Sequence, residues 1–397
     1  MKTIERSIFP LLKQALANPR ILVITGMRRV GKTTSLLWLL DQVPSDNKIY
    51  MDLERIDQRS VFQETNYDNV LNYFRNLGLK TDQPMTVALD EIQNAPNLPS
   101  VVKYLYDHYG LKFLLSGSSS FYLKNLFNES MAGRKVVFEL FPLGFGEFLD
   151  FRGVPYRRKT IPEEMLYDIH EYDRLSAYYE EFITFGGLPN VVLEPKVKTK
   201  REILLDIISS YINIDVKVMA DFRKINELQR LLNALAVRVG NKLDYTKLSQ
   251  IAGISRPTLY EYLDFLEMTY IINRLPAFSI PDKAATLGKK LYFLDNGIAS
   301  VFANPGEGAL FENAVYNQLR VLGELSHLSR GNEYEVDFIL TASQALPVAL
   351  EAKIHPTLKD DLKLKKIAEK NRITNSWLIG RYPTAGFKDF IWGGSIL

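Results

Sequence analysis

The sequence lacks cysteine altogether, so disulfide bonds, thiolate metal ligands and cysteine nucleophiles are all excluded. It also lacks an uninterrupted run of roughly 20 apolar residues, the length that a helix needs to span a bilayer. The amino-terminal segment is charged and is broken by Pro10 and Pro19, unlike the apolar core of a secretory signal. We therefore expect an intracellular, cytoplasmic protein with no membrane partner.

An excess of charge of one sign is absent as well. The 49 Lys and Arg residues nearly balance the 46 Asp and Glu residues, which leaves a formal net charge of +3. The field of the whole chain therefore does not indicate a nucleic-acid partner, and such a partner must be argued from local patterns. There is no low-complexity tract, and 46% of the 397 residues are hydrophobic, enough for two or three independently cored domains.

Short apolar runs alternate with helical stretches in the first part of the chain. The runs lie at residues 21–25, 49–53, 86–90 and 112–117. Strands that alternate with helices predict a parallel sheet covered by helices on both faces. A ligand is then expected at the carboxyl edge of that sheet.

The segment GMRRVGKT, residues 26–33, matches the pattern G-x-x-x-x-G-K-[ST] and lies between a predicted strand and a predicted helix. Its glycines let the backbone curl so that N–H groups face a phosphate, and the following helix adds its positive end. We expect Lys32 to bridge β- and γ-phosphate oxygens and Thr33 to hold Mg²⁺. The residues predicted to contact the nucleotide are Gly26, Met27, Arg28, Arg29, Val30, Gly31, Lys32, Thr33 and Thr34.

A magnesium nucleotide site also needs an acidic residue at the end of a neighbouring strand, and TVALDE supplies Asp90 and Glu91. We expect Asp90 to support Mg²⁺ directly or through water, and Glu91 to polarise the attacking water. Ser116 ends another apolar run and is either a reporter on the γ-phosphate or part of a serine-rich turn. Arg134 is either an arginine finger, in its own or a neighbouring subunit, or a surface arginine.

A second string imitates a nucleotide motif. Residues 241–244, NKLD, spell the N-K-x-D pattern that reads guanine in GTPases. The string lies far from the first region, and the residues after Asp90 do not give the D-x-x-G pattern that accompanies it. ATP, with Mg²⁺, is therefore the expected cofactor.

The middle of the chain is predicted to be helical. Residues 156–235 show a helical period and are expected to form a lid or connector. Two further helices flank a tight turn at Gly253, with Ser255 as the N-cap of the second, which outlines a helix-turn-helix. The apolar runs LPAFSI and KLYFLD that follow are expected to pair as the strands of a winged version.

The helix-turn-helix leaves two interpretations open. Lys242, Lys247 and Arg256 can meet phosphates if the second helix enters a groove of DNA. The second helix also carries three acidic side chains that would repel a phosphate backbone. These are Glu261, Asp264 and Glu267. The motif is therefore either a DNA-binding module or a packing module.

Beyond residue 304, the pattern helix, strand, strand, helix, strand predicts a small α/β domain. Glu351 and Lys353 share one face of a strand, an adjacent strand can bring Asp337 beside them, and Glu312 lies on the preceding helix. Clustered carboxylates with a lysine are typical of metal-dependent phosphodiester cleavage. The alternative is a salt-bridged pair on an exposed strand face. The charge of Asp337 inside an apolar strand disfavours this alternative.

Taken together, these patterns resemble a widespread prokaryotic family of AAA-type ATPases. In that family the ATPase domain precedes a domain of unknown function, DUF4143, with a winged helix and a restriction-endonuclease-like end. The resemblance covers nearly the whole chain. Its marks are GMRRVGKTT, ALDEIQ, LSGSSS, AGRKVVFELFPLGFGEF, FGGLP, LFENAVYNQL, EVDFIL and EAK. The resemblance implies that Lys32, Thr33, Asp90 and Glu91 take the phosphate, metal and water roles.

The same resemblance implies a nuclease-like site at the carboxyl end. Glu312, Asp337, Glu351 and Lys353 match the D-(x)n-E-x-K pattern of such nucleases. Val336 stands where that pattern usually has proline, so cleavage activity is left open.

The predicted fold class is α/β: a P-loop NTPase parallel sheet, a helical lid, a winged helix-turn-helix and a small restriction-endonuclease-like domain. The predicted boundaries are 1–155, 156–235, 236–303 and 304–397. The predicted function is a Mg²⁺-dependent ATP-hydrolysing switch that repositions a DNA-associated, nuclease-like end. The alternative is a nucleotide-dependent binding module whose nuclease-like end cuts nothing. The partners expected are ATP, DNA or another nucleic acid, and a second copy of the chain.

Overall fold

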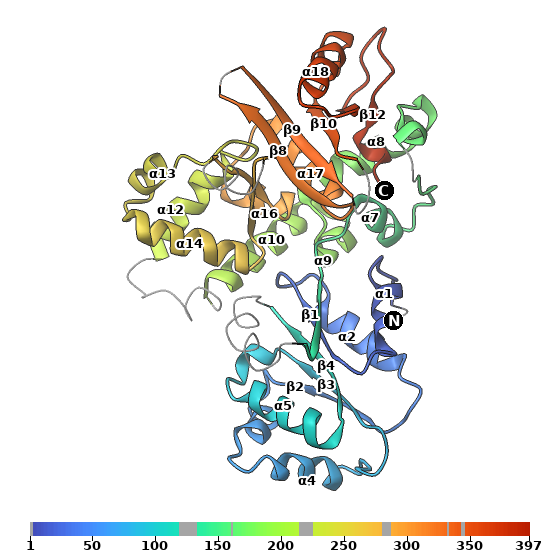
Figure 1. The fold of residues 1–397 in the computed structure, drawn as a ribbon, viewed down its shortest axis with the longest axis vertical. Coiled ribbons are helices and arrows are strands. Elements are labelled where there is room, and N and C mark those ends of the chain that lie inside the picture. The colour runs from blue at the N-terminus through green and yellow to red at the C-terminus, as the bar shows by residue number, and fades with distance from the viewer. Residues whose placement is uncertain are drawn as a thin grey trace. The chain divides into compact units, whose positions relative to one another are not determined.

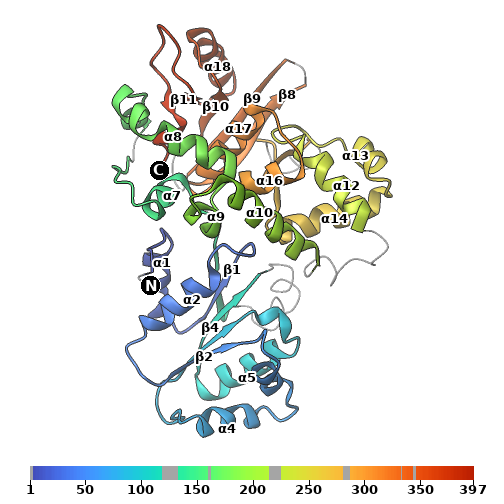
Figure 2. The ribbon, with the colours of Figure 1, turned by 180° about the vertical axis from the view of Figure 1, so that it is seen from behind.

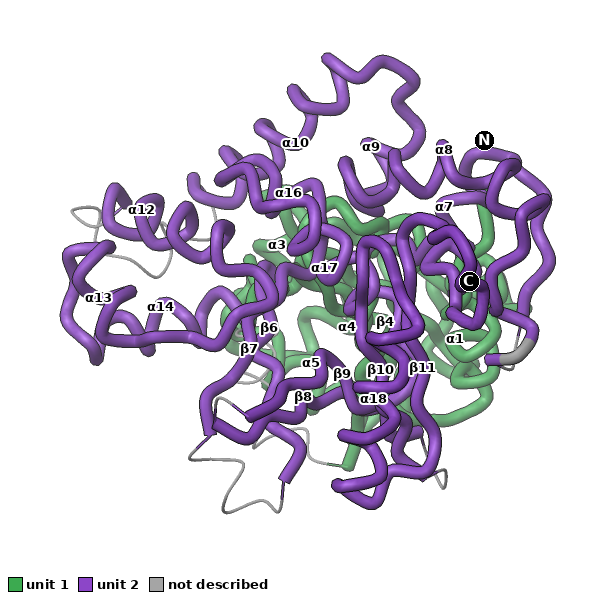
Figure 3. The backbone as a smooth tube through the Cα atoms, turned by 90° about the horizontal axis from the view of Figure 1, so that it is seen from above, with its two compact units in different colours: residues 1–141, 268–270 green, residues 142–267, 271–397 purple. Residues whose placement is uncertain are grey.

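The structure is a computed structural model, in which the chain forms two compact units (Figure 3). Unit 1 comprises residues 1–141 and 268–270, and unit 2 comprises residues 142–267 and 271–397. The four-part division proposed from the sequence is finer than these units and stays a prediction. The residues described are 3–118, 133–159, 162–213, 225–279, 287–331, 333–342 and 346–397.

Unit 1 is built on a five-stranded parallel sheet (Figures 1 and 2). Its strands are β1 (Ile21–Thr25), β2 (Lys48–Asp52), β3 (Thr86–Asp90), β4 (Lys112–Gly117) and β5 (Lys135–Glu139), in the order β2-β3-β4-β1-β5. The predicted parallel sheet is thus confirmed. Because β4 lies between β1 and β3, the carboxyl ends of these three strands meet at one edge.

Helices cover both faces of this sheet. Odd-numbered residues of β1, such as Val23, join a core with residues of α4 (Asp68–Asn76) and α5 (Leu98–Tyr109). On the other face α2 (Lys32–Asp41) contacts β1, β3 and β4. Every residue of β1 and β3 is buried, as expected for central parallel strands. The remaining elements of unit 1 are α1 (Phe9–Leu16), α3 (Ile56–Ser60), η1 (Val61–Gln63) and η2 (Ile92–Asn94).

Unit 2 begins with a helical block. Its helices are α7 (Phe145–Phe151), α8 (Ile169–Phe185), α9 (Pro189–Leu193), α10 (Val197–Tyr211) and α12 (Ile225–Ala236), with η3 (Pro162–Met165) between α7 and α8. The Gly-Gly-Leu-Pro turn between α8 and α9 is held by Asp295, whose carboxylate accepts a 2.8 Å hydrogen bond from the Gly187 amide. Asp295 also caps α16 (Asn296–Phe302) by accepting from the Ile298 amide at 3.0 Å.

The second glycine of this turn has no room for a side chain. A Cβ at Gly187 would lie 2.1 Å from the carbonyl oxygen of Leu143. We expect Gly187→Ala to lower the free energy of unfolding by about 3 kcal/mol, because two backbone segments must separate. Gly144→Ala is the matched control, since nothing lies within 4 Å of the Cβ it would add. Chemical denaturation of the two variants measures the difference, and equal stabilities would contradict the close packing.

The helix-turn-helix is present in unit 2. It consists of α13 (Tyr245–Ala252) and α14 (Arg256–Met268), with Gly253 in a left-handed conformation at φ 71° between them. Ser255 accepts a hydrogen bond from the Thr258 amide at 3.3 Å, as its predicted capping role requires.

A two-stranded sheet follows, of β6 (Ile272–Leu275) antiparallel to β7 (Lys290–Phe293). The sequence predicts that the first strand runs through LPAFSI, residues 275–280. It instead ends before Pro276, which has no N–H to donate to the ladder.

The carboxyl-terminal part of unit 2 is a five-stranded mixed sheet in the order β12-β11-β10-β9-β8. Strands β8, β9 and β10 are antiparallel, whereas β10, β11 and β12 are parallel. Helix α17 contacts β10, and α18 contacts β10 and β11. The elements are α17 (Glu307–Leu319), β8 (Glu324–Arg330), β9 (Tyr334–Thr341), β10 (Val348–Lys353), α18 (Leu358–Lys370), β11 (Asn375–Gly380), β12 (Ile391–Trp392) and η6 (Gly393–Ser395). Within the described residues, we find no helix whose length and apolar character would allow it to cross a bilayer.

Candidate nucleotide site and carboxyl-terminal carboxylate cluster

The predicted phosphate loop connects β1 to α2, at the edge where the parallel strands end. Gly31, the residue before α2, has φ 98°, a conformation that favours glycine. A Cβ at Gly26 would lie 2.1 Å from the Leu140 carbonyl oxygen, so the loop starts in close contact with the segment after β5. Met27 and Val30 are buried and anchor the loop in the core.

Lys32 opens α2 and is buried, with its ammonium held against the loop. Its Nζ donates to the carbonyl oxygens of Gly26 at 3.1 Å and Met27 at 2.9 Å. The loop is also tied from outside by Arg6, which donates to the Val30 carbonyl at 3.0 Å and to the Phe141 carbonyl at 2.8 Å. Arg6 belongs to no recognisable motif, so its contact with the loop was not predicted from the sequence.

Asp90 is the centre of the site. It ends β3, is 2% exposed, and accepts hydrogen bonds from the Thr33 hydroxyl at 2.6 Å and the Tyr50 hydroxyl at 3.2 Å. The Glu91 amide donates to the other carboxylate oxygen at 3.0 Å, and so does the Ser116 hydroxyl. Ser116 reaches Asp90 because β4 is the neighbour of β3 in the sheet. Three predicted residues, Thr33, Asp90 and Ser116, are therefore brought together.

Tyr50 was not predicted, although it lies in the apolar run of β2, next to β3 in the sheet. Burial, followed by the charge of Asp90, raises its pKa above the ordinary value for tyrosine. The phenol therefore stays protonated and remains a donor to the carboxylate. The only feature that could have indicated a role for Tyr50 is its position on β2, the strand beside β3.

Glu91 follows Asp90 with φ 52°, an uncommon backbone conformation for a non-glycine residue. Its carboxylate accepts a hydrogen bond from the Gln93 side-chain amide, which also donates to the Ser118 hydroxyl at 3.1 Å. The Ser118 amide donates back to Gln93 at 3.3 Å. Gln93 therefore links Glu91 to the end of β4. Ser119, which belongs to the same serine-rich turn, lies outside the described residues.

These residues fit a nucleotide phosphate with Mg²⁺. Gly26 lets the loop pack closely against the backbone of Leu140, and the buried ammonium of Lys32 supplies positive charge. The hydroxyl of Thr33 and the carboxylate of Asp90 are the hard oxygen ligands that Mg²⁺ prefers. Arg28 and Arg29 belong to the same loop, where Arg29 is exposed with φ 66°.

Arg134 is the predicted site residue that lies elsewhere. It immediately precedes β5, and its carbonyl accepts from the Ile21 amide at the start of β1. The phosphate loop follows the other end of β1, at Thr25, so the two lie at opposite ends of the strand pair. Its guanidinium pairs with Asp107 at 2.8 Å. Within its own chain Arg134 is therefore not brought to the loop, and a role in a neighbouring subunit stays a prediction.

The carboxyl-terminal carboxylates gather around a lysine that the sequence analysis did not single out. Lys290, the first residue of β7, is 1% exposed. Its Nζ lies 2.9 Å from Asp337, 2.8 Å from Glu335 and 3.4 Å from Glu312. Burial opposes the charged lysine, but the charges of these carboxylates raise its pKa above the ordinary value. We call Lys290, Glu312, Glu335, Asp337, Glu351 and Lys353 the carboxylate cluster.

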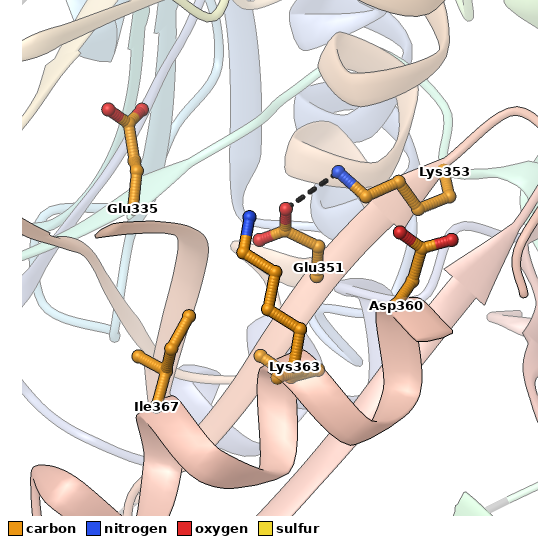
Figure 4. A pocket seen from close by; sticks show the side chains of 7 residues that line it. Glu335, Glu351, Lys353, Asp360, Lys363 and Ile367 are labelled. Atoms are coloured by element: carbon orange, nitrogen blue, oxygen red, sulfur yellow. Dashed lines mark hydrogen bonds and ion pairs between the residues drawn. The ribbon is translucent and has the colours of Figure 1, made fainter. Parts of the chain in front are cut away.

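Glu351 and Lys353 form an ion pair at the side of this cluster, with Nζ and Oε1 2.7 Å apart. They line a small, solvent-open pocket with Glu335 and residues of α18, and Figure 4 shows Lys363 pointing toward Glu351. Burial, followed by the charge of Asp337, raises the pKa of Glu351 and that of Glu312 above the ordinary value for glutamate. Both shifts limit the negative charge that the cluster carries.

The cluster does not fit a divalent metal. Asp337 uses one oxygen for Lys290 and the other for the Ala352 amide, at 3.1 Å. Glu351 accepts from Lys353 and from the Asp337 amide at 3.1 Å. Among the residues described, no group of three or more acidic or histidine side chains is arranged to hold a metal ion. The predicted residues are brought together, but around an ammonium.

The helix-turn-helix surface is less acidic than the sequence suggested. Asp264 and Glu267 both pair with Arg274 of β6, so only Glu261 of the three acidic residues lacks this internal cation. Side chains exposed near the turn include Lys247, Arg256 and Tyr260.

Comparison with known proteins divides the chain into two matched regions. A family described as "AAA domain" matches residues 18–149, and a domain of unknown function, DUF8612, matches residues 176–307. The uncharacterised protein MJ1544 of Methanocaldococcus jannaschii is 31% identical over 332 residues, which are 81% of this chain and 72% of that protein. An uncharacterised protein of Haemophilus influenzae is 25% identical over 80% of this chain and 79% of its own length.

Among solved structures, the Walker-type ATPase PABY2304 of Pyrococcus abyssi is similar with a TM-score of 0.48. It is 16% identical, and the match covers 76% of this chain and 96% of that chain.

Proposed function

This chain belongs to the same family as the archaeal protein MJ1544 and carries an AAA-type ATPase domain, and from this premise we propose a Mg²⁺-dependent ATP-hydrolysing switch. The observation that carries the proposal is the hydrogen bond between Thr33 of the phosphate loop and Asp90 at the end of β3. It joins the two residues that would share the metal. When bound, Mg²⁺ neutralises charge that develops on the phosphates during transfer.

Each site residue takes a role that its position supports. Lys32, whose ammonium already lies against the loop, would hold the β- and γ-phosphates. Glu91 would orient and polarise the attacking water, with Gln93 fixing the direction of its carboxylate. Ser116 would contact the γ-phosphate side of the site from the tip of β4.

Adenine is proposed as the base. The string NKLD, which could have indicated guanine, lies in unit 2. Its Asp244 caps α13 by accepting a hydrogen bond from the Lys247 amide at 3.0 Å. The string therefore has a local structural role at a helix start, which supports ATP over GTP.

For unit 2 we propose a nucleic-acid-associated module of the DUF4143 kind, with α14 as the helix that meets DNA. The ion pairs of Arg274 with Asp264 and Glu267 remove much of the electrostatic objection to a phosphate backbone. The nucleolytic role of Glu312, Asp337, Glu351 and Lys353 has no comparable support. We further propose that the chain assembles with copies of itself, that it is cytoplasmic, and that Arg134 acts as an arginine finger in a neighbouring subunit.

Steady-state ATP turnover by the full-length chain tests both parts. We expect turnover with Mg²⁺, none with excess EDTA, and at least a twofold change in kcat when duplex DNA is added. Arg256→Ala should remove the DNA response and leave basal turnover intact. The control is Lys198→Ala, which removes an exposed cation of α10. Absence of turnover would reject the ATPase, whereas turnover that ignores DNA would reject only the nucleic-acid part.

A further inference from the structure

Lys290 reaches the carboxylate cluster from a different part of unit 2. The lysine begins β7 of the two-stranded sheet next to the helix-turn-helix. Glu312 lies on α17, and Glu335 and Asp337 lie on β9. Glu335 and Asp337 are two residues apart on one strand, so their side chains share a face. The ammonium therefore sits among three carboxylates that two other elements contribute.

The ammonium is buried and its partners are close. Lys290 is 1% exposed, and its Nζ lies 2.8 Å from Glu335 and 2.9 Å from Asp337. Buried carboxylates that lack a cation cost several kcal/mol each, so a cluster of this kind needs an internal positive charge. Lys290 supplies that charge with donors that match the geometry of the three acceptors.

A divalent cation and this ammonium would compete for the same oxygens. Mg²⁺ and Mn²⁺ need free carboxylate lone pairs at about 2.1 Å. The hydroxyl of Tyr292 also occupies Glu312, donating to Oε1 at 2.6 Å. Both oxygens of Asp337 are engaged, and Lys290 and Tyr292 meet at Oε1 of Glu312, so a metal that bridged Glu312 and Asp337 would have to displace Lys290.

We propose that Lys290 is the resident cation of the carboxylate cluster, in place of a divalent metal, and that this end of the chain is a structural junction that cuts nothing. Neighbouring contacts belong to the same junction. Lys242 pairs with Glu335 at 3.6 Å, and the Gly240 amide donates to the Leu291 carbonyl at 2.8 Å. Lys290 fastens β7 to β9, and the segment after α12 that carries Gly240 and Lys242 is bonded to both strands. This inference does not depend on ATP hydrolysis.

The segment after β6 makes a second attachment to the same sheet. The Phe278 amide donates to the His327 carbonyl at 2.6 Å, and the His327 amide donates to the Pro276 carbonyl at 2.9 Å. The His327 ring also contacts the Gly288 carbonyl at 2.8 Å. The segment after β6 and the segment before β7 are thus both bonded to β8, while Lys290 of β7 pairs with β9. Contacts on both strands are expected to hold the β6–β7 pair in one position.

The test compares thermal melting of full-length wild type and Lys290→Met, without nucleotide and with or without millimolar Mn²⁺. Lys290→Met keeps the length of the side chain but removes its charge. We expect its Tm to fall by about 10 °C, since breaking a buried ion network is strongly destabilising. Mn²⁺ should restore at least half of that loss, because the freed carboxylates can then bind it. The matched control is Lys289→Met, one residue earlier and only partly buried, which should melt like wild type.

Asp337→Asn changes the carboxylate cluster but keeps the phosphate loop, so it shows how far Mn²⁺ raises the Tm by binding outside the cluster. The Tm of wild type should rise with Mn²⁺ by no more than this amount. Lys290→Arg, which keeps the charge, should retain most of the stability and covers the case in which Lys290→Met does not fold. Wild type should also leave single-stranded and duplex DNA and RNA intact with Mn²⁺ or Mg²⁺. The proposal is overturned by metal-dependent cleavage that Asp337→Ala and Glu351→Ala abolish. A wild-type Mn²⁺ stabilisation that Asp337→Asn removes would overturn it equally.

Discussion

Replacing Lys32 by alanine is expected to reduce ATP turnover by about 100-fold to 1,000-fold while the chain stays folded. The ammonium of Lys32 lies against two carbonyl oxygens of the loop, at 3.1 and 2.9 Å. Removing a preorganised positive group from a phosphoryl-transfer site costs this much because few other groups offset the charge that develops. Binding of Mg·ATP should weaken as well, which isothermal titration would record.

Lys48→Ala is the matched control for this experiment. Lys48 also donates to two backbone carbonyls, those of Leu40 at 3.0 Å and Val43 at 2.8 Å, but at the far end of α2. The variant should lose about 1 kcal/mol of stability and keep its turnover. Undiminished turnover in Lys32→Ala would place hydrolysis somewhere other than this loop.

Glu91→Gln should separate binding from hydrolysis. The amide keeps an oxygen that can accept from Gln93, so the local geometry survives while the negative charge that polarises water is lost. We expect kcat to fall by about 100-fold or more, the usual contribution of a general base, with the affinity for Mg·ATP changed less than about threefold. Single-turnover kinetics together with titration of Mg·ATP measure the two quantities.

Glu64→Gln provides the comparison, since Glu64 is an exposed carboxylate of the same unit that accepts from Asn69 at 3.0 Å. Its kcat should match that of wild type. If Glu91→Gln hydrolysed ATP at the wild-type rate, the water-activating role would have to pass to another group.

Much of unit 1 could be predicted from sequence because its signals are local. The alternation of apolar runs with helical stretches gave the parallel sheet, and the spacing of glycines and Lys32 gave the loop between β1 and α2. The register of parallel strands then explains why Asp90 and Ser116 meet. Strand β5 was missed because its apolar run is only three residues long and lies between Lys135 and Glu139.

The partners of the site could not be predicted, because they depend on which strands are neighbours. Tyr50 reaches Asp90 only because β2 lies beside β3, and Arg6 is 24 residues from Val30 in the chain. Strand β8, ELSHLSR, was missed since its polar side chains resemble those of a loop.

The carboxylate cluster is the clearest case of a sequence pattern that leaves its chemistry open. Spacing placed Glu351 and Lys353 on one strand face, which the ion pair between them bears out. Nothing in the sequence brought Lys290 to Asp337, because they are 47 residues apart and belong to different sheets. A motif can identify the acidic side chains of a cluster, but only the tertiary structure shows which positive charge balances them.

The phosphate loop is held against residues 140–141, which follow the last strand of the unit 1 sheet. The Leu140 amide donates to the Thr25 carbonyl at 2.7 Å, and the next residue of the loop, Gly26, is packed against the Leu140 carbonyl without room for a methyl group. Arg6 holds Val30 and Phe141 with one guanidinium. A change in the curl of the loop therefore pulls directly on the stretch of chain that continues into the rest of the protein. If the loop moves when a nucleotide binds, we therefore expect Leu140 and Phe141 to move with it, because Leu140 contacts the loop directly and Arg6 joins Phe141 to it.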